Sequence, residues 1–158
     1  MNTKSAPKPN NAPRAKSAAR LYAVQATYQM IVNDQTADQV VDDFLVFRIG
    51  GEPELKDLAQ PEGTLFRAIV SGAGEHRAAL SEVIGNHLKE GASITGMTDN
   101  EPLLLSILLC GGYELMSHTN IDAPIIISDY LNITHAYYQG SESRIINAIL
   151  DAMAKLYR

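Results

Sequence analysis

Residues 103–116 have the sequence LLLSILLCGGYELM, and this stretch decides the fold class. Six of its first seven residues are leucine or isoleucine. Because such residues cover every side of a helix, the helix belongs in the middle of a bundle. Gly111 and Gly112 each cost about 1 kcal/mol in a helix relative to alanine, so we expect a closely approaching neighbour helix to offset that cost. The stretch therefore predicts a central buried helix over residues 103–116.

Apolar residues recur at helical spacing on both sides of this stretch. Thr98 and Glu101 have capping-box spacing and are expected to begin the central helix. Further helices are predicted from about residue 14, over 38–47, from about 63, around 80–88, from Asp122 and Pro124, and after a cap at Ser141 or Ser143. We count about seven helices and no convincing hairpin. The predicted fold class is therefore all-α, a helical bundle.

The domain organisation follows from the same pass along the chain. Residues 1–13 are rich in Pro, Asn, Lys and Ala and cannot bury enough apolar surface to order, so we predict a flexible basic N-terminal arm. Residues 14–158 are predicted to form one helical domain of two packed halves, about 14–90 and 97–158. The glycine-containing segment 91–96 is the expected linker between them.

Charge is divided unevenly along the chain, which has 13 Lys and Arg against 18 Asp and Glu. The positive charges near the N-terminus are Lys4, Lys8, Arg14, Lys16 and Arg20, and the first carboxylate is Asp34. A basic arm on an acidic body is expected of a protein whose terminus meets a polyanion such as RNA. A basic solubility tail is the plain alternative.

Two features of the first helix bear on RNA. Lys16 and Arg20 lie one turn apart beside its apolar stripe, so we expect both to be exposed cations. Tyr22 and Tyr28 are of the residue type that stacks on bases. Tyr28 falls on the apolar stripe and is expected in the core, whereas Tyr22 lies off it and its role stays open.

No set of residues has the spacing of a catalytic or metal site. Cys110 lies in the most apolar segment and is expected to be a buried hydrophobe rather than a nucleophile. The histidines are scattered, and none forms an i, i+4 pair with a carboxylate between. Gly72-Ala73-Gly74 lacks the third glycine of a dinucleotide loop. We therefore expect a binding protein, with no enzymatic activity and no cofactor.

Nothing in the sequence predicts a membrane or secreted protein. The longest apolar run is too short to span a bilayer, and residues 1–20 have no apolar stretch like that of a secretory signal. A single cysteine fits a reducing compartment. We expect a cytoplasmic protein.

Several segments, taken in order, carry a family resemblance. They are the basic arm together with the sequence ARLYAVQATYQ at 19–29, then FRAIVSG at 66–72, then ILLCGGYEL at 107–115, DAP at 122–124 and INAILD at 146–151. The first resembles the opening helix of the bacterial transcription antitermination factor family NusB. FRAIVSG resembles a helix in the first half of that family, and the last three motifs resemble its C-terminal half. The resemblance covers roughly residues 14–156.

This resemblance implies a function and a set of partners. It implies an all-helical protein that pairs with NusE, a small-subunit ribosomal protein, and with it holds the boxA element of nascent ribosomal RNA. RNA polymerase in that antitermination complex then resists termination. The RNA-binding residues implied are Arg14, Lys16, Arg20 and Gln25, and the partner-binding residues are Tyr28, Ser141 and Glu142.

The chain departs from the family pattern in places that concern RNA. Ser17, Ala18 and Ala19 thin the arginine cluster, and Ser128-Asp129 stands where the family has Asn-Glu. We expect weaker RNA affinity, or more dependence on the partner, than is typical. The acidic body would repel RNA but could attract a basic ribosomal protein. Whether the chain forms a homodimer stays open.

Two alternatives stand beside this prediction. The same fold serves as the RNA-positioning domain of an rRNA cytosine methyltransferase, but that role needs a downstream Rossmann region, and none follows up to Arg158. The other alternative is a helical interaction scaffold with no RNA role.

Overall fold

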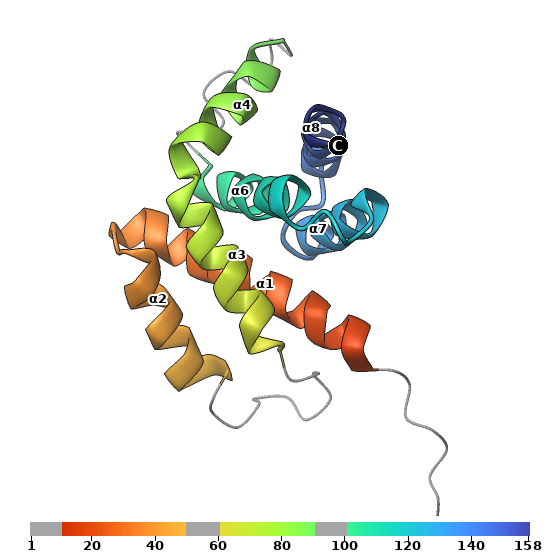
Figure 1. Cartoon of the computed structure of the whole chain (residues 1–158). Helices are drawn as coiled ribbons and strands as arrows, with labels where there is room; N and C mark the ends of the chain where they lie inside the picture. The colour runs from red at the N-terminus through yellow and green to blue at the C-terminus, as the bar shows by residue number, and fades with distance from the viewer. Residues whose placement is uncertain (1–10, 50–60, 91–100) are drawn as a thin grey trace, which may run out of the picture.

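The computed structural model describes residues 11–49, 61–90 and 101–158, and within them every regular element is a helix. The elements are α1 (Asn11–Asn33), α2 (Ala37–Phe44), the π-helical segment η1 (Leu45–Ile49), α3 (Gly63–Glu75), α4 (Arg77–Glu90), α6 (Pro102–Ser117), α7 (Ala123–Tyr137) and α8 (Glu142–Tyr157). The predicted all-α class is confirmed (Figure 1). The described residues form seven α-helices, in agreement with the expected number of about seven.

Helix α6 occupies the middle of the bundle, where it contacts α1, α3, α4, α7 and α8 (Figure 1). Its residues from Leu104 to Gly112 are all buried, because the apolar side chains that surround the helix axis meet a neighbour on each side. The predicted central buried helix over residues 103–116 is confirmed.

The two glycines of α6 allow α7 and α8 to approach it closely. A Cβ atom added at Gly111 would lie 3.0 Å from Leu150 of α8 and 3.3 Å from Tyr130 of α7. A Cβ atom added at Gly112 would collide with the end of the Met153 side chain. The expected close approach of a neighbouring helix is therefore present at both positions.

Helices α1 and α3 pack against α6, and α2 packs on α1 and α3 (Figure 1). The start of α3 lies beside the start of α1, because the Glu62 amide donates to the Ala15 carbonyl at 3.1 Å. Helix α2 begins at a capping box formed by Thr36 and Gln39. The helix predicted over 38–47 corresponds to α2 together with η1, so its path changes from α-helical to π-helical after Phe44.

Tyr22 packs among these helices. Its ring meets the ring of Phe44 edge-on at 6.3 Å, and Phe44 in turn stacks on Phe66 of α3 at 5.7 Å. Tyr22 is therefore half-buried against α2.

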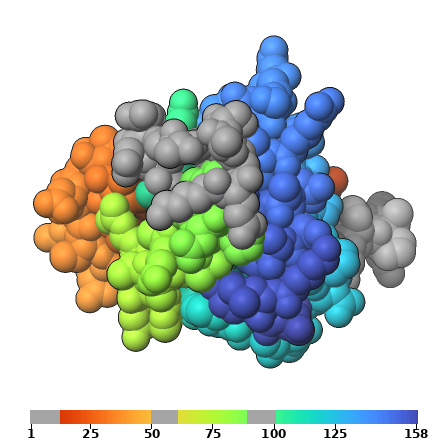
Figure 2. Space-filling model, turned by 90° about the horizontal axis from the view of Figure 1, so that it is seen from above, coloured from red at the N-terminus to blue at the C-terminus, as the bar shows by residue number. Residues whose placement is uncertain are grey.

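The remaining boundaries follow the sequence with small changes. Helix α1 begins at Asn11, before the expected start at residue 14, while residues 1–10 of the predicted arm lie outside the described residues. The expected linker at 91–96 and the cap at Thr98 also lie outside them. Ser141 precedes α8, but its side chain makes no capping hydrogen bond. Figure 2 shows α8 beside α4 on one face, so helices from both parts of the chain meet there.

Candidate nucleic-acid interface

Arg20 lies at the centre of a buried polar network that joins α1, α6 and α7. Its Nε donates to Glu114 Oε2 at 2.7 Å and its Nη2 to Glu114 Oε1 at 3.1 Å. Its Nη1 donates to Asp129 Oδ2 at 2.7 Å. The residue is 2% exposed. The expectation that Arg20 is an exposed cation is therefore wrong, because two carboxylates from other helices hold the guanidinium inside the bundle.

Glu114 is the other half of this network and is fully buried on α6. Besides the two bonds from Arg20, its carboxylate accepts from Tyr130 Oη at 2.6 Å and from His118 Nδ1 at 2.9 Å. Burial by itself would raise the pKa of Glu114, but the hydrogen bonds from His118 and Arg20 and the charge of Arg20 outweigh it, so the pKa is lowered. Glu114 is therefore a charged group satisfied inside the core.

The outer edge of the network reaches the start of α1. Asp129 of α7 accepts from Ser17 Oγ with both carboxylate oxygens, at 3.0 and 2.9 Å, as well as from Arg20. Sequence reasoning missed Glu114 and Asp129 as partners. A carboxylate inside an otherwise apolar helix was the available signal, since a buried charge requires an opposite one.

Arg14 and Lys16 are the cations that this end of α1 does present to solvent. Both side chains are exposed on the first turns of the helix. In Figure 1 this end of α1 projects from the bundle, away from α4 and α8. Of the cations predicted for RNA on α1, these two are accessible in the described structure, and Arg20 is not.

Further along α1, a groove separates the helix from η1 and the end of α7. Gln25 donates from Nε2 to Tyr137 Oη at 2.9 Å, while its Oε1 is buried without a partner. Tyr28 is 37% exposed at this groove, so the expectation that it lies in the core is wrong. The groove encloses about 470 Å³ and is lined by Gln25, Tyr28, Gln29, Val32, Asn33, Phe44, Arg48, Leu103 and Tyr137.

Beside the groove lies a group of acids and tyrosines contributed by α1 and by the ends of α6, α7 and α8. Partial burial raises the pKa of Tyr138 to about 12, with added contributions from the charges of Glu101 and Glu142, a hydrogen bond with Glu101, and Tyr28. The structure therefore brings Tyr28 and Glu142, two of the residues predicted for partner binding, to one region. Ser141 is exposed next to Glu142, whose Oε1 has no hydrogen-bond partner. We call Tyr28, Glu101, Tyr138 and Glu142 the acid–tyrosine cluster.

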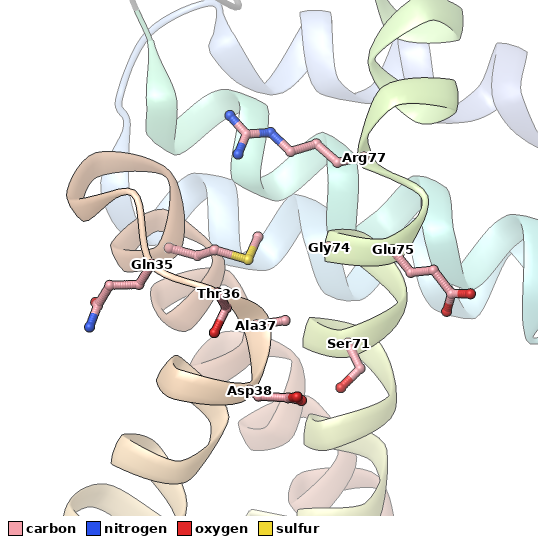
Figure 3. A pocket seen from close by; sticks show the side chains of 9 residues that line it. Gln35, Thr36, Ala37, Asp38, Ser71, Gly74, Glu75 and Arg77 are labelled. Atoms are coloured by element: carbon pink, nitrogen blue, oxygen red, sulfur yellow. The ribbon is translucent and has the colours of Figure 1, made fainter.

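A second hollow lies between the α1–α2 turn and the junction of α3 with α4. Figure 3 shows Asp38 and Ser71 pointing toward one another, whereas Gln35, Glu75 and Arg77 point away from them. These polar groups therefore do not converge on a ligand. Among the described residues, no group of three or more His, Cys, Asp or Glu could hold a metal ion.

Cys110 is buried beside Thr27, with 3.3 Å between Sγ and Oγ1. Burial raises the pKa of its thiol to about 12, which keeps the thiol protonated and unreactive. The expectation that this cysteine is a buried hydrophobe is confirmed.

No helix in the described part of the chain is long and apolar enough to cross a membrane.

Comparison with known proteins gives a consistent result. The sequence model of the NusB family matches residues 17–155. The transcription antitermination protein NusB of Novosphingobium aromaticivorans is 30% identical over 142 residues, which cover 90% of this chain and 94% of that protein. Its namesake in Bradyrhizobium sp. (strain ORS 278) is 32% identical over 143 residues, with 90% and 83% covered. A solved structure of T. maritima NusB superposes with a TM-score of 0.70 at 20% identity, covering 88% of this chain and 89% of that one, and so shares the fold.

Proposed function

The chain belongs to the NusB family of transcription antitermination factors, and from this membership we propose that it binds boxA-type single-stranded RNA jointly with ribosomal protein NusE. In that assembly it would help RNA polymerase resist termination on nascent ribosomal RNA. Members of this family are transcription factors rather than enzymes. The observation that carries the RNA proposal is the pair of exposed cations at the start of α1 on an otherwise acidic chain.

Arg14 and Lys16 are the proposed phosphate contacts. Their exposure lets them meet a backbone without breaking any packing of the bundle. Gln25 is the proposed base contact, because its amide group lies at the groove and carries no charge that would attract phosphate. Arg20 supports this surface from inside by fixing α1 against α6 and α7.

The acid–tyrosine cluster is the proposed site for the basic partner, together with the neighbouring Ser141. Glu101 and Glu142 supply negative charge, and the Tyr28 ring supplies an exposed aromatic face. Lysine and arginine side chains are attracted by both features. The unpartnered Oε1 of Glu142 supports the proposal, since an incoming donor would satisfy it.

These two surfaces explain why RNA binding should be cooperative. A few exposed cations neutralise few phosphates, so the chain alone would bind RNA weakly. A basic partner at the acid–tyrosine cluster would cover negative charge and extend the positive surface beside α1. The scaffold alternative, with no RNA role, shares the partner surface but not the contact at Arg14 and Lys16.

We expect the double variant Arg14→Ala/Lys16→Ala to bind single-stranded boxA-like RNA more weakly, with an unchanged fold. Each lost phosphate contact should reduce the slope of log affinity against log salt by about 0.7 for a single strand. Fluorescence anisotropy over a salt series measures both quantities. The matched control is Arg77→Ala/Lys155→Ala, which removes two exposed cations from α4 and α8. An equal effect of both double variants, or no effect of either, would place the scaffold alternative first.

A further inference from the structure

Ser17 and Arg20 present two hydrogen-bond donors on one face of α1, three residues apart, and one carboxylate holds both. Asp129 takes Ser17 Oγ with both of its oxygens, at 3.0 and 2.9 Å, and Arg20 Nη1 at 2.7 Å. Hydroxyl and guanidinium groups of this kind also bind RNA phosphates. The carboxylate oxygens thus stand where phosphate oxygens could.

The charge of Asp129 is not needed to neutralise Arg20. Glu114 already pairs with the guanidinium through two hydrogen bonds at 2.7 and 3.1 Å, deeper in the bundle. One cation therefore faces two carboxylates, and the group has an excess negative charge whenever His118 is neutral. The side chain of Asp129 is 19% exposed, so this excess lies at the rim where the RNA would arrive.

The position of Asp129 along α1 matters for RNA. Arg14 lies three residues before Ser17, on the same side of the helix and one turn closer to the N-terminus. An RNA strand that contacts Arg14 and continues along this side of α1 next reaches Ser17 and Asp129. The carboxylate of Asp129 would repel the next phosphate and would also occupy the Ser17 hydroxyl that could bind it.

We propose that Asp129 is a built-in competitor of RNA phosphate, which limits the RNA affinity of the free chain. This inference rests on the proposed RNA-binding function of the same surface. Replacing the carboxylate by a neutral amide removes the repulsion and weakens the hold on the Ser17 hydroxyl, which can then turn toward phosphate, while Arg20 stays buried. The role of the partner would then be to add contacts to RNA that outweigh the repulsion from Asp129.

The test is Asp129→Asn in the full chain, with a single-stranded boxA-like RNA measured by fluorescence anisotropy over a salt series. We expect RNA binding to tighten by roughly threefold to tenfold at low salt, and the salt slope to steepen by up to about 0.7 for one gained phosphate. The fold should persist because Arg20 keeps both hydrogen bonds to Glu114. If Asp129→Asn unfolds at a lower temperature than the wild type in circular dichroism, Asp129→Ser serves as a second neutral variant.

Two controls separate this effect from general changes in charge. Asp151→Asn removes an equal charge from α8, where the carboxylate is 56% exposed and pairs with Lys155, and should leave RNA affinity nearly unchanged. Asp129→Glu keeps the charge and should bind like the wild type. The inference would be overturned, and the proposed function would not, if Asp129→Asn and Asp129→Ser bound RNA with the same affinity as the wild type or as Asp151→Asn. An absence of RNA binding by the wild type and every folded variant would overturn the proposed RNA function as well.

Discussion

Arg20→Ala is expected to destabilise the fold by about 3–5 kcal/mol, a large part of the stability of a domain this size. The variant would leave Glu114 charged, fully buried and without its cation. Tyr130 and His118 would still donate to Glu114, but neither brings the permanent positive charge that offsets its desolvation. Urea unfolding followed by circular dichroism measures the loss.

The exposed neighbour Lys16 provides the matched control. Lys16→Ala should change the free energy of unfolding by less than about 0.5 kcal/mol. The paired variant Arg20→Met/Glu114→Leu should recover much of the loss, because apolar groups of similar size often replace a buried ion pair without cost. A loss below about 1 kcal/mol for Arg20→Ala would contradict the network described for α1, α6 and α7.

Acid should weaken the same network in the wild type. The pKa of Glu114 is lowered in the folded state, so its ionisation contributes stability above its ordinary value of 4.5. That contribution is lost as the pH falls below 4.5 and then through the lower pKa that Glu114 has in the folded state. Stability measured against pH should therefore decline less steeply over this range in Arg20→Met/Glu114→Leu.

Leu108→Asp is expected to abolish the fold, with a loss of more than about 4 kcal/mol. Leu108 is 0% exposed on α6, the helix that contacts α1, α3, α4, α7 and α8. A carboxylate there has no cation within its own apolar helix face, and Arg20 is already held by Glu114 and Asp129. Far-UV circular dichroism and size-exclusion chromatography should show loss of the cooperative, compact state.

The control for this charge is Leu156→Asp. Leu156 lies near the end of α8 with 59% exposure, so the same substitution should cost little there. A cooperative melt of Leu108→Asp within a few degrees of the wild type would contradict the central position of α6.

The fold could be predicted largely because α6 is apolar on all sides. A helix with that property is expected to be buried among other helices. The glycines at 111 and 112 then indicated where those helices come closest, and Leu150 and Met153 occupy those places. The residues of α6 alone were enough for these conclusions.

The positions of Arg20 and Tyr28 could not be predicted in the same way. Spacing along α1 indicates which side of the helix a residue faces. How deeply its side chain is buried depends on the residues that other helices place against that side. Glu114 and Asp129, about a hundred residues away in the sequence, draw Arg20 inward. Tyr28 stays exposed because the groove between α1, η1 and the end of α7 leaves its ring uncovered.

The central claim of joint RNA binding is tested most directly by measuring RNA affinity with and without purified NusE. We predict that the chain alone binds boxA-like RNA weakly and that NusE tightens binding by about 5-fold to 150-fold, the usual range of coupling between two ligands. Glu142→Lys, which reverses a charge of the acid–tyrosine cluster, should reduce this gain while leaving the RNA affinity of the free chain no weaker. An RNA affinity that saturating NusE does not change would contradict the account.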